Sequence, residues 1–331
     1  MSAPLPMSAP AVRWGILGAG GIAHKLAEAV TEYTASTVVA VGSRDLAKAQ
    51  HFADEFGIPT AHGSYEELVG DPEVDVIYVA TPHSHHHEHA LLAIEAGKHV
   101  LCEKAFTQNA AQAREVVAAA RAKGVFLMEA MWTRHLPHMY AIRELIARGE
   151  IGDIVSVQAD HGQALTHVER MFRADLAGGA LLDLGVYPIA FAHDILGVPD
   201  RITAAGRLRD TGVDGQIGMV FDYATAQASL TTTMEARTPC TAHIAGTEGR
   251  IEIDDTFYTP TSFTVTRHDG TSWFYDGDVP NGFQFEAAEV ARRIHAGDTE
   301  SALLTLDQSL EIMEIMDEVR SQIGLVYPNE S

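Results

Sequence analysis

Residues 12–23 read VRWGILGAGGIA, an apolar run that passes directly into a glycine-rich turn and then into an alanine-rich segment. The run predicts a strand over Arg13–Leu17, and the segment beyond the turn predicts a helix over Ile22–Tyr33. Gly18 permits a tight turn and Gly20 lets the backbone approach a pyrophosphate, as in the GxGxxA pattern of dinucleotide-binding proteins. The stretch therefore predicts a dinucleotide site, with an ordinary strand-to-helix turn as the alternative.

The same alternation of short β-branched runs and alanine-rich helical patterns continues to about residue 134. It is typical of βαβ units, which build a parallel sheet whose strands all end at one edge, where ligands bind. Further strands are expected over residues 37–41, 74–80, 99–102 and 125–128, and further helices over residues 46–56, 86–96 and 110–123, with a short helix opening at Ser64.

After residue 134 the pattern changes to threonine-rich, alternating runs with short turns, which indicate an antiparallel, half-exposed sheet. Helices are expected over residues 180–196, 283–296 and 306–323. The fold class is therefore α/β: a disordered lead-in (1–11), an N-terminal Rossmann domain (12–134), and a C-terminal α+β domain (135–327) with a large, mostly antiparallel open sheet. Strands in that sheet are expected over residues 154–159, 201–206, 217–221, 226–233, 242–245, 250–253, 263–267 and 272–275.

Length and charge narrow the function classes. The chain has 331 residues, which favours two domains, and its 45 acidic against 23 basic side chains give a formal net charge of -22. Such a chain is a poor partner for nucleic acid or anionic membranes, and it favours a neutral small-molecule substrate. Only two widely spaced cysteines occur, and residues 1–10 lack the features of a signal peptide. No run of roughly 18 apolar residues is evident. The cytoplasm is the expected location.

The end of the second expected strand bears on the choice of cofactor. Folds that prefer NAD place Asp or Glu there to accept hydrogen bonds from the ribose hydroxyls, whereas this chain has Ser43 and Arg44. A hydroxyl and a guanidinium suit the 2′-phosphate of NADP. Asp45 follows at the expected N-cap of the next helix, so we expect it to cap. NADP is therefore favoured, with NAD as the alternative.

Residues 81–89 read TPHSHHHEH and hold five histidines within seven positions. His85 and His89 stand four residues apart on an expected helix, a spacing compatible with zinc. No compact set of thiolate or carboxylate ligands accompanies them, so a loop at the cofactor edge with exposed imidazoles is the favoured interpretation. We expect no metal.

Two further places combine groups suited to proton transfer. Lys104 follows a strand end, where it could hold a substrate hydroxyl and tune the pKa of a proton donor; the alternative is a solvated lysine. Asp183 and Tyr187 are four residues apart on an expected helix behind a Gly-Gly loop. Tyrosine can exchange a proton with an alkoxide if a cation lowers its pKa from about 10; the alternative is a capped helix with a packing tyrosine.

Together these motifs resemble the Gfo/Idh/MocA oxidoreductase family over nearly the whole chain. The shared motifs are LGAGGIA (17–23), TPH (81–83), AGKHVLCEK (96–104) and GTEGRI (246–251). Three more, FLMEAMWTR (126–134), GGALLDLGVYP (178–188) and GFQFEA (282–287), resemble the branch that contains the dimeric dihydrodiol dehydrogenases, also described as NADP-dependent D-xylose 1-dehydrogenases.

The resemblance implies roles for individual residues. Tyr187 would be the general acid/base, and Lys104 would contact substrate near the nicotinamide. Asp183 would orient either the substrate or the catalytic pair. The family's Glu-Lys-Pro motif is Glu103-Lys104-Ala105 here, so either Ala105 keeps the family backbone at a cost or Lys104 is placed differently. The expected cofactor-binding residues are Gly18, Gly20, Gly21, Ile22, Ser43, Arg44, Thr81, Pro82, His83, His86, Glu103, Lys104, Glu129 and Trp132.

The resulting hypothesis is reversible hydride transfer between NADP(H) and a secondary alcohol or cyclic hemiacetal of a sugar, polyol or dihydrodiol. His161, His167 and Arg173 are candidate substrate contacts. A homodimer or homotetramer formed through the C-terminal sheet is expected from the resemblance. The alternatives are a tightly bound dinucleotide used for transient oxidation in glycoside cleavage, a non-catalytic dinucleotide-binding sensor, and a metal hydrolase built on the histidine stretch.

Overall fold

The computed structural model describes residues 3–330 and divides the chain into two compact units. The N-terminal unit comprises Pro4–Trp132 and Asn281–Leu310, and the C-terminal unit comprises Thr133–Pro280 and the residues from Glu311 onward. The first division between the units falls between Trp132 and Thr133. The segment 281–310 differs from expectation, because its contacts assign it to the dinucleotide-binding unit.

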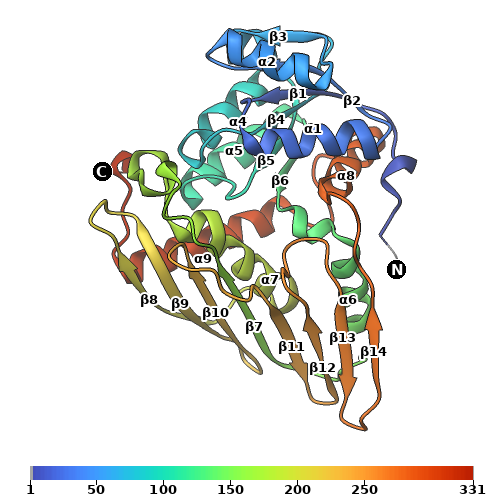
Figure 1. Cartoon of the computed structure of the whole chain (residues 1–331), viewed down its shortest axis with the longest axis vertical. Coiled ribbons are helices and arrows are strands. Elements are labelled where there is room, and N and C mark those ends of the chain that lie inside the picture. The colour runs from blue at the N-terminus through green and yellow to red at the C-terminus, as the bar shows by residue number, and fades with distance from the viewer. Residues whose placement is uncertain (1–2, 331) are drawn as a thin grey trace. The chain divides into compact units, whose positions relative to one another are not determined.

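A six-stranded parallel sheet forms the centre of the N-terminal unit (Figure 1). The strand order is β3-β2-β1-β4-β5-β6, so β1 and β4 are neighbours at the point where the chain reverses its direction of winding. Ligands bind at such a switch point in doubly wound sheets. The strands are β1 (Arg13–Leu17), β2 (Thr37–Gly42), β3 (Thr60–His62), β4 (Val76–Val79), β5 (His99–Glu103) and β6 (Leu127–Ala130). Only the three-residue β3 was not expected.

The helices of this unit begin at polar caps. Asp45 accepts hydrogen bonds from the amides of residues 47 and 48, which confirms its expected capping role, and Ser64 and Asn109 cap the next helices in the same way. The last helix packs against the first, and Phe283 stacks on Trp132 with ring centroids 4.4 Å apart. The helices are α1 (Gly21–Tyr33), α2 (Leu46–Phe56), α3 (Tyr65–Val69), α4 (His86–Glu95), α5 (Ala110–Lys123) and α8 (Phe283–Ala296).

The segment before β1 differs from the disordered lead-in that the sequence predicts. Pro6–Ser8 form a short 3₁₀ helix in contact with α8, and Arg292 Nη2 donates to the Leu5 carbonyl oxygen at 2.8 Å. Ala9 is buried. Residues 1–2 lie outside the described residues.

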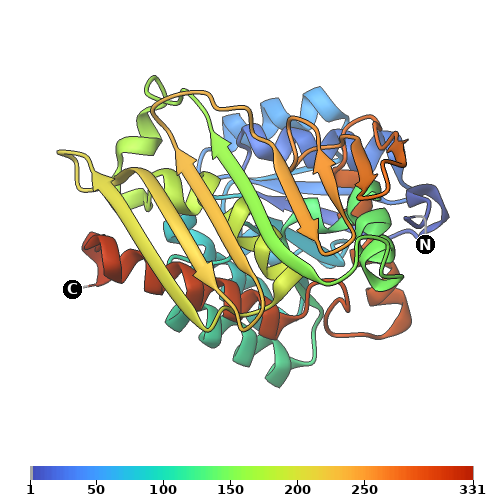
Figure 2. The same ribbon diagram turned by 90° about the horizontal axis from the view of Figure 1, so that it is seen from below.

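The C-terminal unit contains an eight-stranded sheet in the order β14-β13-β12-β11-β7-β10-β9-β8 (Figure 2). Every neighbouring pair is antiparallel except β7 and β10, which are parallel, so the expected mostly antiparallel sheet is confirmed. The strands are β7 (Ile154–Gly162), β8 (Arg201–Leu208), β9 (Asp214–Asp222), β10 (Gln227–Thr233), β11 (Ala242–Gly246), β12 (Gly249–Ile253), β13 (Phe263–Arg267) and β14 (Ser272–Tyr275).

One face of this sheet is covered by α7 (Val186–Leu196), which contacts β7 and β10. A single π-helical turn, Leu181–Gly185, leads into α7, so the expected helix over 180–196 is present but opens with a wider turn. Two other helices complete the fold: α6 (Pro137–Ala147), and α9 (Leu306–Ile323), whose residues are divided between the two units.

Asp214 holds the start of that π-helical turn. Its Oδ2 accepts a hydrogen bond from the Leu181 amide at 2.7 Å. Gly179 lies so close that a Cβ there would meet Asp214 Oδ1 at 2.1 Å, and its φ of +118° also favours glycine. Burial raises the pKa of Asp214 to about 6. A buried carboxyl therefore positions the segment that carries Asp183 and Tyr187.

The stretch Ala174–Leu196 is long and apolar enough to cross a membrane by composition, and the mean hydropathy of its most apolar 18-residue window is 1.3. Of its most apolar window, 94% is buried inside the protein. This burial identifies it as a core helix, whereas no run of that kind was expected from the sequence.

The raised pKa of Asp214 predicts a measurable pH dependence. Folding favours the protonated carboxyl of Asp214. Its contribution to the free energy of unfolding is therefore greatest below the ordinary carboxyl pKa, and this stabilisation is lost as pH rises through about 6. At about 1.4 kcal/mol for each pKa unit, the loss is on the order of 3 kcal/mol. In Asp214→Asn, whose amide oxygen still accepts from Leu181, the unfolding free energy relative to wild type should rise by that amount between pH 4 and pH 7. Urea unfolding across this range measures it, and parallel curves for the two proteins would contradict the assignment.

Candidate functional site

The glycine turn after β1 has the shape that a dinucleotide requires. Gly18 has φ +105°, and a Cβ there would meet the Ala80 carbonyl oxygen at 2.9 Å, so only glycine lets β1 and β4 end side by side. A Cβ at Gly20 would have one neighbour, at 4.0 Å, and one at Gly21 would have none within 4 Å. The space in front of this turn and of the α1 N-terminus is open to a phosphate. The residues present therefore fit a dinucleotide.

At the end of β2, Arg44 and Ser43 occupy the expected place. Ser43 is buried and its Oγ accepts from the Asp45 amide at 3.2 Å. Arg44 is exposed, and its guanidinium hydrogen-bonds the Tyr65 hydroxyl. Because the Tyr65 phenol is neutral, this hydrogen bond does not neutralise the positive charge of Arg44, which can still attract an anionic ligand.

His86 links two turns at this edge of the sheet. Its Nδ1 lies 2.8 Å from the Ala105 carbonyl oxygen and its Nε2 lies 2.8 Å from the Thr81 carbonyl oxygen. Burial lowers the pKa of His86 to about 4, so the ring is neutral at physiological pH and donates to one carbonyl at a time. His86 is thus a buried connection between the turns after β4 and β5.

The other histidines of this stretch are also engaged within the unit. His89 Nδ1 lies 3.0 Å from Thr81 Oγ1, and His85 stacks on the His89 ring. His83 is buried and its ring meets that of His86 edge-on. Within residues 3–330 no group of three or more His, Cys, Asp and Glu side chains could hold a metal ion.

The two glutamates expected at the cofactor edge are buried. Glu103 accepts hydrogen bonds from the Tyr78 hydroxyl and from the Lys104 amide, and Glu129 accepts from Ser309 Oγ at 2.7 Å. Lys104 itself is half-buried, and its peptide bond to Ala105 is cis.

A second set of predicted residues meets in the C-terminal unit. The ring of Tyr187 lies edge-on to His161, with centroids 5.2 Å apart, and packs on Tyr258 at 4.7 Å. His161 Nδ1 donates to the Leu184 carbonyl oxygen at 3.0 Å, which leaves Nε2 to accept from Gln163 Nε2 at 2.9 Å. The side chain of Gln163 also donates to the Tyr258 hydroxyl at 3.0 Å. These contacts fix the ring orientations around Tyr187.

Asp183 and the two remaining substrate candidates are placed as follows. Asp183 is 8% exposed and accepts from Arg170 Nη2 at 2.9 Å. Arg173 is exposed and pairs with Asp175. His167 lines a cavity of about 450 Å³ together with Gln163 and Tyr258.

Three residues that line this cavity were not predicted from the sequence: Gln163, Tyr258 and Arg237. They come from three different loops of the chain, and no motif marks them. The available signal was their position just beyond the ends of strands β7, β10 and β12.

Comparisons with known proteins agree with both halves of this architecture. Residues 12–131 match the model of the oxidoreductase family with an NAD-binding Rossmann fold, and residues 139–252 match the Gfo/Idh/MocA C-terminal domain. The chain belongs to the Gfo/Idh/MocA family. As a member of this family it is an NAD(P)-dependent oxidoreductase that acts on CH–OH groups.

Among the relatives are the trans-1,2-dihydrobenzene-1,2-diol dehydrogenases of Mus musculus and Danio rerio. Each is 40% identical to this chain, with 97% of this chain and 99% of the relative covered. Among solved structures, KijD10, a 3-ketoreductase from Actinomadura kijaniata in complex with NADP and TDP-benzene, has a TM-score of 0.86 and 28% identity over 95% of this chain and 98% of that chain. An aldose-aldose oxidoreductase from Caulobacter crescentus shares the fold, with a TM-score of 0.86 at 23% identity over 95% of this chain and 97% of that chain.

The position of His86 leads to a stability prediction. His86→Ala removes the buried donor shared by the Thr81 and Ala105 carbonyls, and a buried polar group without a partner costs about 1–3 kcal/mol. Urea unfolding should show a loss of that size, together with weaker binding of NADPH by fluorescence titration. His85→Ala is the control, because that half-buried ring hydrogen-bonds the neighbouring Ser84 hydroxyl and not a backbone carbonyl of another turn. Equal effects of the two substitutions would show that His86 is an ordinary packing residue.

Proposed function

We propose that the protein is an NADP-preferring oxidoreductase that interconverts a secondary alcohol or cyclic hemiacetal of a sugar, polyol or dihydrodiol with its carbonyl compound. The observation that carries the proposal is a tyrosine, Tyr187, fixed beside His161 and Tyr258 next to a polar cavity. The names of the relatives, diol dehydrogenase and ketoreductase, support the same chemistry.

The cofactor would be held by the chain's own backbone and by one cation. Gly18, Gly20 and Gly21 leave room for a pyrophosphate at the α1 N-terminus, and Arg44 offers a guanidinium to a 2′-phosphate. When bound, the nicotinamide supplies hydride-transfer chemistry at its C4 atom. Local donors of this kind suit NADP more than NAD.

Proton transfer would fall to Tyr187, as proposed from the sequence. In oxidation its phenol oxygen would accept the hydroxyl proton of the substrate, and in reduction it would return that proton to the developing alkoxide. Lys104 would stabilise the phenolate by its positive charge. Asp183, tied to Arg170 at 2.9 Å, would orient the substrate.

We also propose a cytoplasmic homodimer or homotetramer that assembles through the C-terminal sheet. In support, α7 covers one face of that sheet, and the strands carry exposed apolar side chains, Val155 on β7 and Val220 on β9. Light scattering on the purified protein measures the mass.

Replacing Tyr187 by Phe tests the proton-transfer role. The variant keeps the ring packing on His161 and Tyr258 but removes the proton acceptor, so kcat should fall by about 10²-fold or more while the dissociation constant for NADPH stays within a factor of two. Turnover is followed by NADPH absorbance across a panel of sugars, polyols and diols. Tyr223→Phe is the matched control, because the Tyr223 hydroxyl is buried and has no hydrogen-bond partner. A fully active Tyr187→Phe enzyme would refute the role.

Arg44→Ala tests the cofactor preference. Loss of a guanidinium that binds the 2′-phosphate should weaken NADPH binding about 10- to 100-fold and change NADH binding by less than threefold. Fluorescence titrations with the two cofactors give the ratio. Equal losses for both would mean that Arg44 serves the adenine rather than the phosphate.

A further inference from the structure

The cavity beside Tyr187 lies wholly within the C-terminal unit. Its volume is about 450 Å³, which is within the usual range for a small-molecule site. Residues 162–165 with His167 form one wall, and residues 237–240 with Thr256 and Tyr258 form the other. Since the Tyr258 ring packs 4.7 Å from that of Tyr187, a molecule in this cavity lies next to the proposed proton acceptor.

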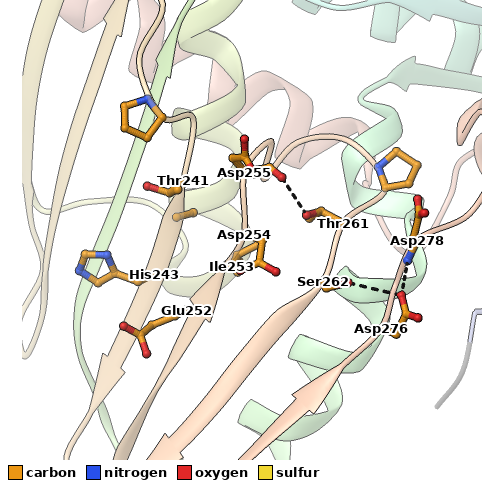
Figure 3. Close-up of a pocket in the computed structure, with 13 residues that line it drawn as sticks. Thr241, His243, Glu252, Ile253, Asp254, Asp255, Thr261, Ser262, Asp276 and Asp278 are labelled. Carbon is orange, nitrogen blue, oxygen red and sulfur yellow. Dashed lines mark hydrogen bonds between the residues drawn. The ribbon is translucent and has the colours of Figure 1, made fainter.

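The lining of this cavity differs in charge from the rest of the protein. It contains Arg237 and His167 and no carboxylate, in a chain where acidic residues outnumber lysine and arginine about two to one. A larger cavity of about 900 Å³ on the same sheet shows the opposite composition (Figure 3). Its labelled acidic residues are Glu252, Asp254, Asp255, Asp276 and Asp278.

Arg237 is also free of an ion pair. Between Thr133 and Pro280, a stretch that lies inside the described residues, every arginine except Arg207 and Arg237 has a carboxylate oxygen within 4.0 Å. Arg207 lies on β8 and does not line the cavity. Arg237 thus combines two features: an uncompensated guanidinium and a place in the cavity wall.

Two carboxylates in the segments that form the cavity walls already have partners of their own. Glu235 pairs with Arg209, and Asp160 accepts from the amides of Cys240 and Thr241 at 3.0 Å each. Burial raises the pKa of the Tyr258 phenol, and the positive charge of Arg237 acts to lower that pKa. Arg237 therefore interacts electrostatically with a group that lines the cavity.

The wall that carries Arg237 is held in place. Thr238 N donates to the Gly162 carbonyl oxygen at 3.1 Å, and Asp160 ties down the two residues that follow Pro239. A Cβ at Gly162 would meet Thr238 Cγ2 at 2.5 Å, so the two walls are in close contact at that point. The guanidinium therefore projects from an ordered segment and not from a free loop.

We propose that this cavity binds an anionic group of the substrate, a carboxylate or a phosphate, through Arg237 with His167 as a second donor. The guanidinium offers two parallel N–H donors to such a group, while Gln163 and Tyr258 provide polar contacts for sugar hydroxyls on the side of Tyr187. The inference rests on the proposed function and specifies its substrate class: an acidic or phosphorylated sugar in place of the neutral one expected from net charge.

The test compares one sugar in three forms: glucose, glucuronate and glucose 6-phosphate. Wild type, Arg237→Ala and Arg207→Ala are titrated with each by calorimetry in the presence of NADP, and turnover is followed by NADPH absorbance. At least one anionic form should bind wild type more tightly than glucose. Arg237→Ala should reduce that affinity about 10- to 100-fold, the loss expected for a charge-assisted hydrogen bond, and leave glucose within a factor of two. Arg207→Ala, which removes an equally unpaired arginine away from the cavity, should match wild type.

The outcomes separate the two proposals. Turnover of glucose with no preference for either anion, or equal effects of Arg237→Ala on neutral and anionic forms, overturns the anion site and leaves the oxidoreductase proposal standing. Anion binding that depends on Arg237 but gives no turnover supports the site and removes the proposed reaction for this panel. A preference for glucuronate identifies a carboxylate, and a preference for glucose 6-phosphate identifies a phosphate. Absence of binding by any form overturns the inference.

Discussion

The closeness of two strand ends is the constraint on which the N-terminal unit depends. β1 and β4 can end side by side because the residue after β1 has no side chain: a Cβ at Gly18 would lie 2.9 Å from the Ala80 carbonyl oxygen. All six strands are parallel, so the turns after β2, β4 and β5 open at the same edge. His86 then joins two of these turns through the carbonyls of Thr81 and Ala105. One glycine and one buried histidine thereby bring backbone amides, Arg44 and Lys104 to a single edge.

Most elements could be predicted because their signals are local. Hydrophobic period, caps and glycine turns located α2 and α5, β13 and β14 to the residue. The failures involve long-range contacts. The helix Phe283–Ala296 was correctly predicted, but its own sequence does not indicate that it packs on α1, about 250 residues earlier. The three-residue β3 is too short to carry a period, and its pairing with β2 alone makes it a strand.

The same distinction between local signals and long-range contacts applies to the residues of the candidate site. Gly18, Arg44, Lys104, Asp183 and Tyr187 lie in or next to motifs whose residue types are set by turn geometry or by proton chemistry, so the sequence indicated them. Gln163, Tyr258 and Arg237 lie on irregular connections, and their common cavity exists only because β7, β10 and β12 end near one another in the folded sheet. The sequence identifies Asp160 and Glu235 as acidic residues, but only the structure shows that backbone amides bind the first and that Arg209 pairs with the second.

Net charge is a weak guide to ligands for a physical reason. At physiological ionic strength charges on the surface are screened beyond about 8 Å, so most of the 45 carboxylates act little on any one cavity. The local charge around a bound anion is set by the few groups within that distance and by whether those groups already have partners. Arg44, held by a phenol, and Arg237, without a carboxylate, are cations of this kind in a strongly acidic chain. Both a phosphorylated cofactor and an anionic substrate are therefore compatible with a net charge of -22, whereas a nucleic acid, which needs an extended cationic surface, is not.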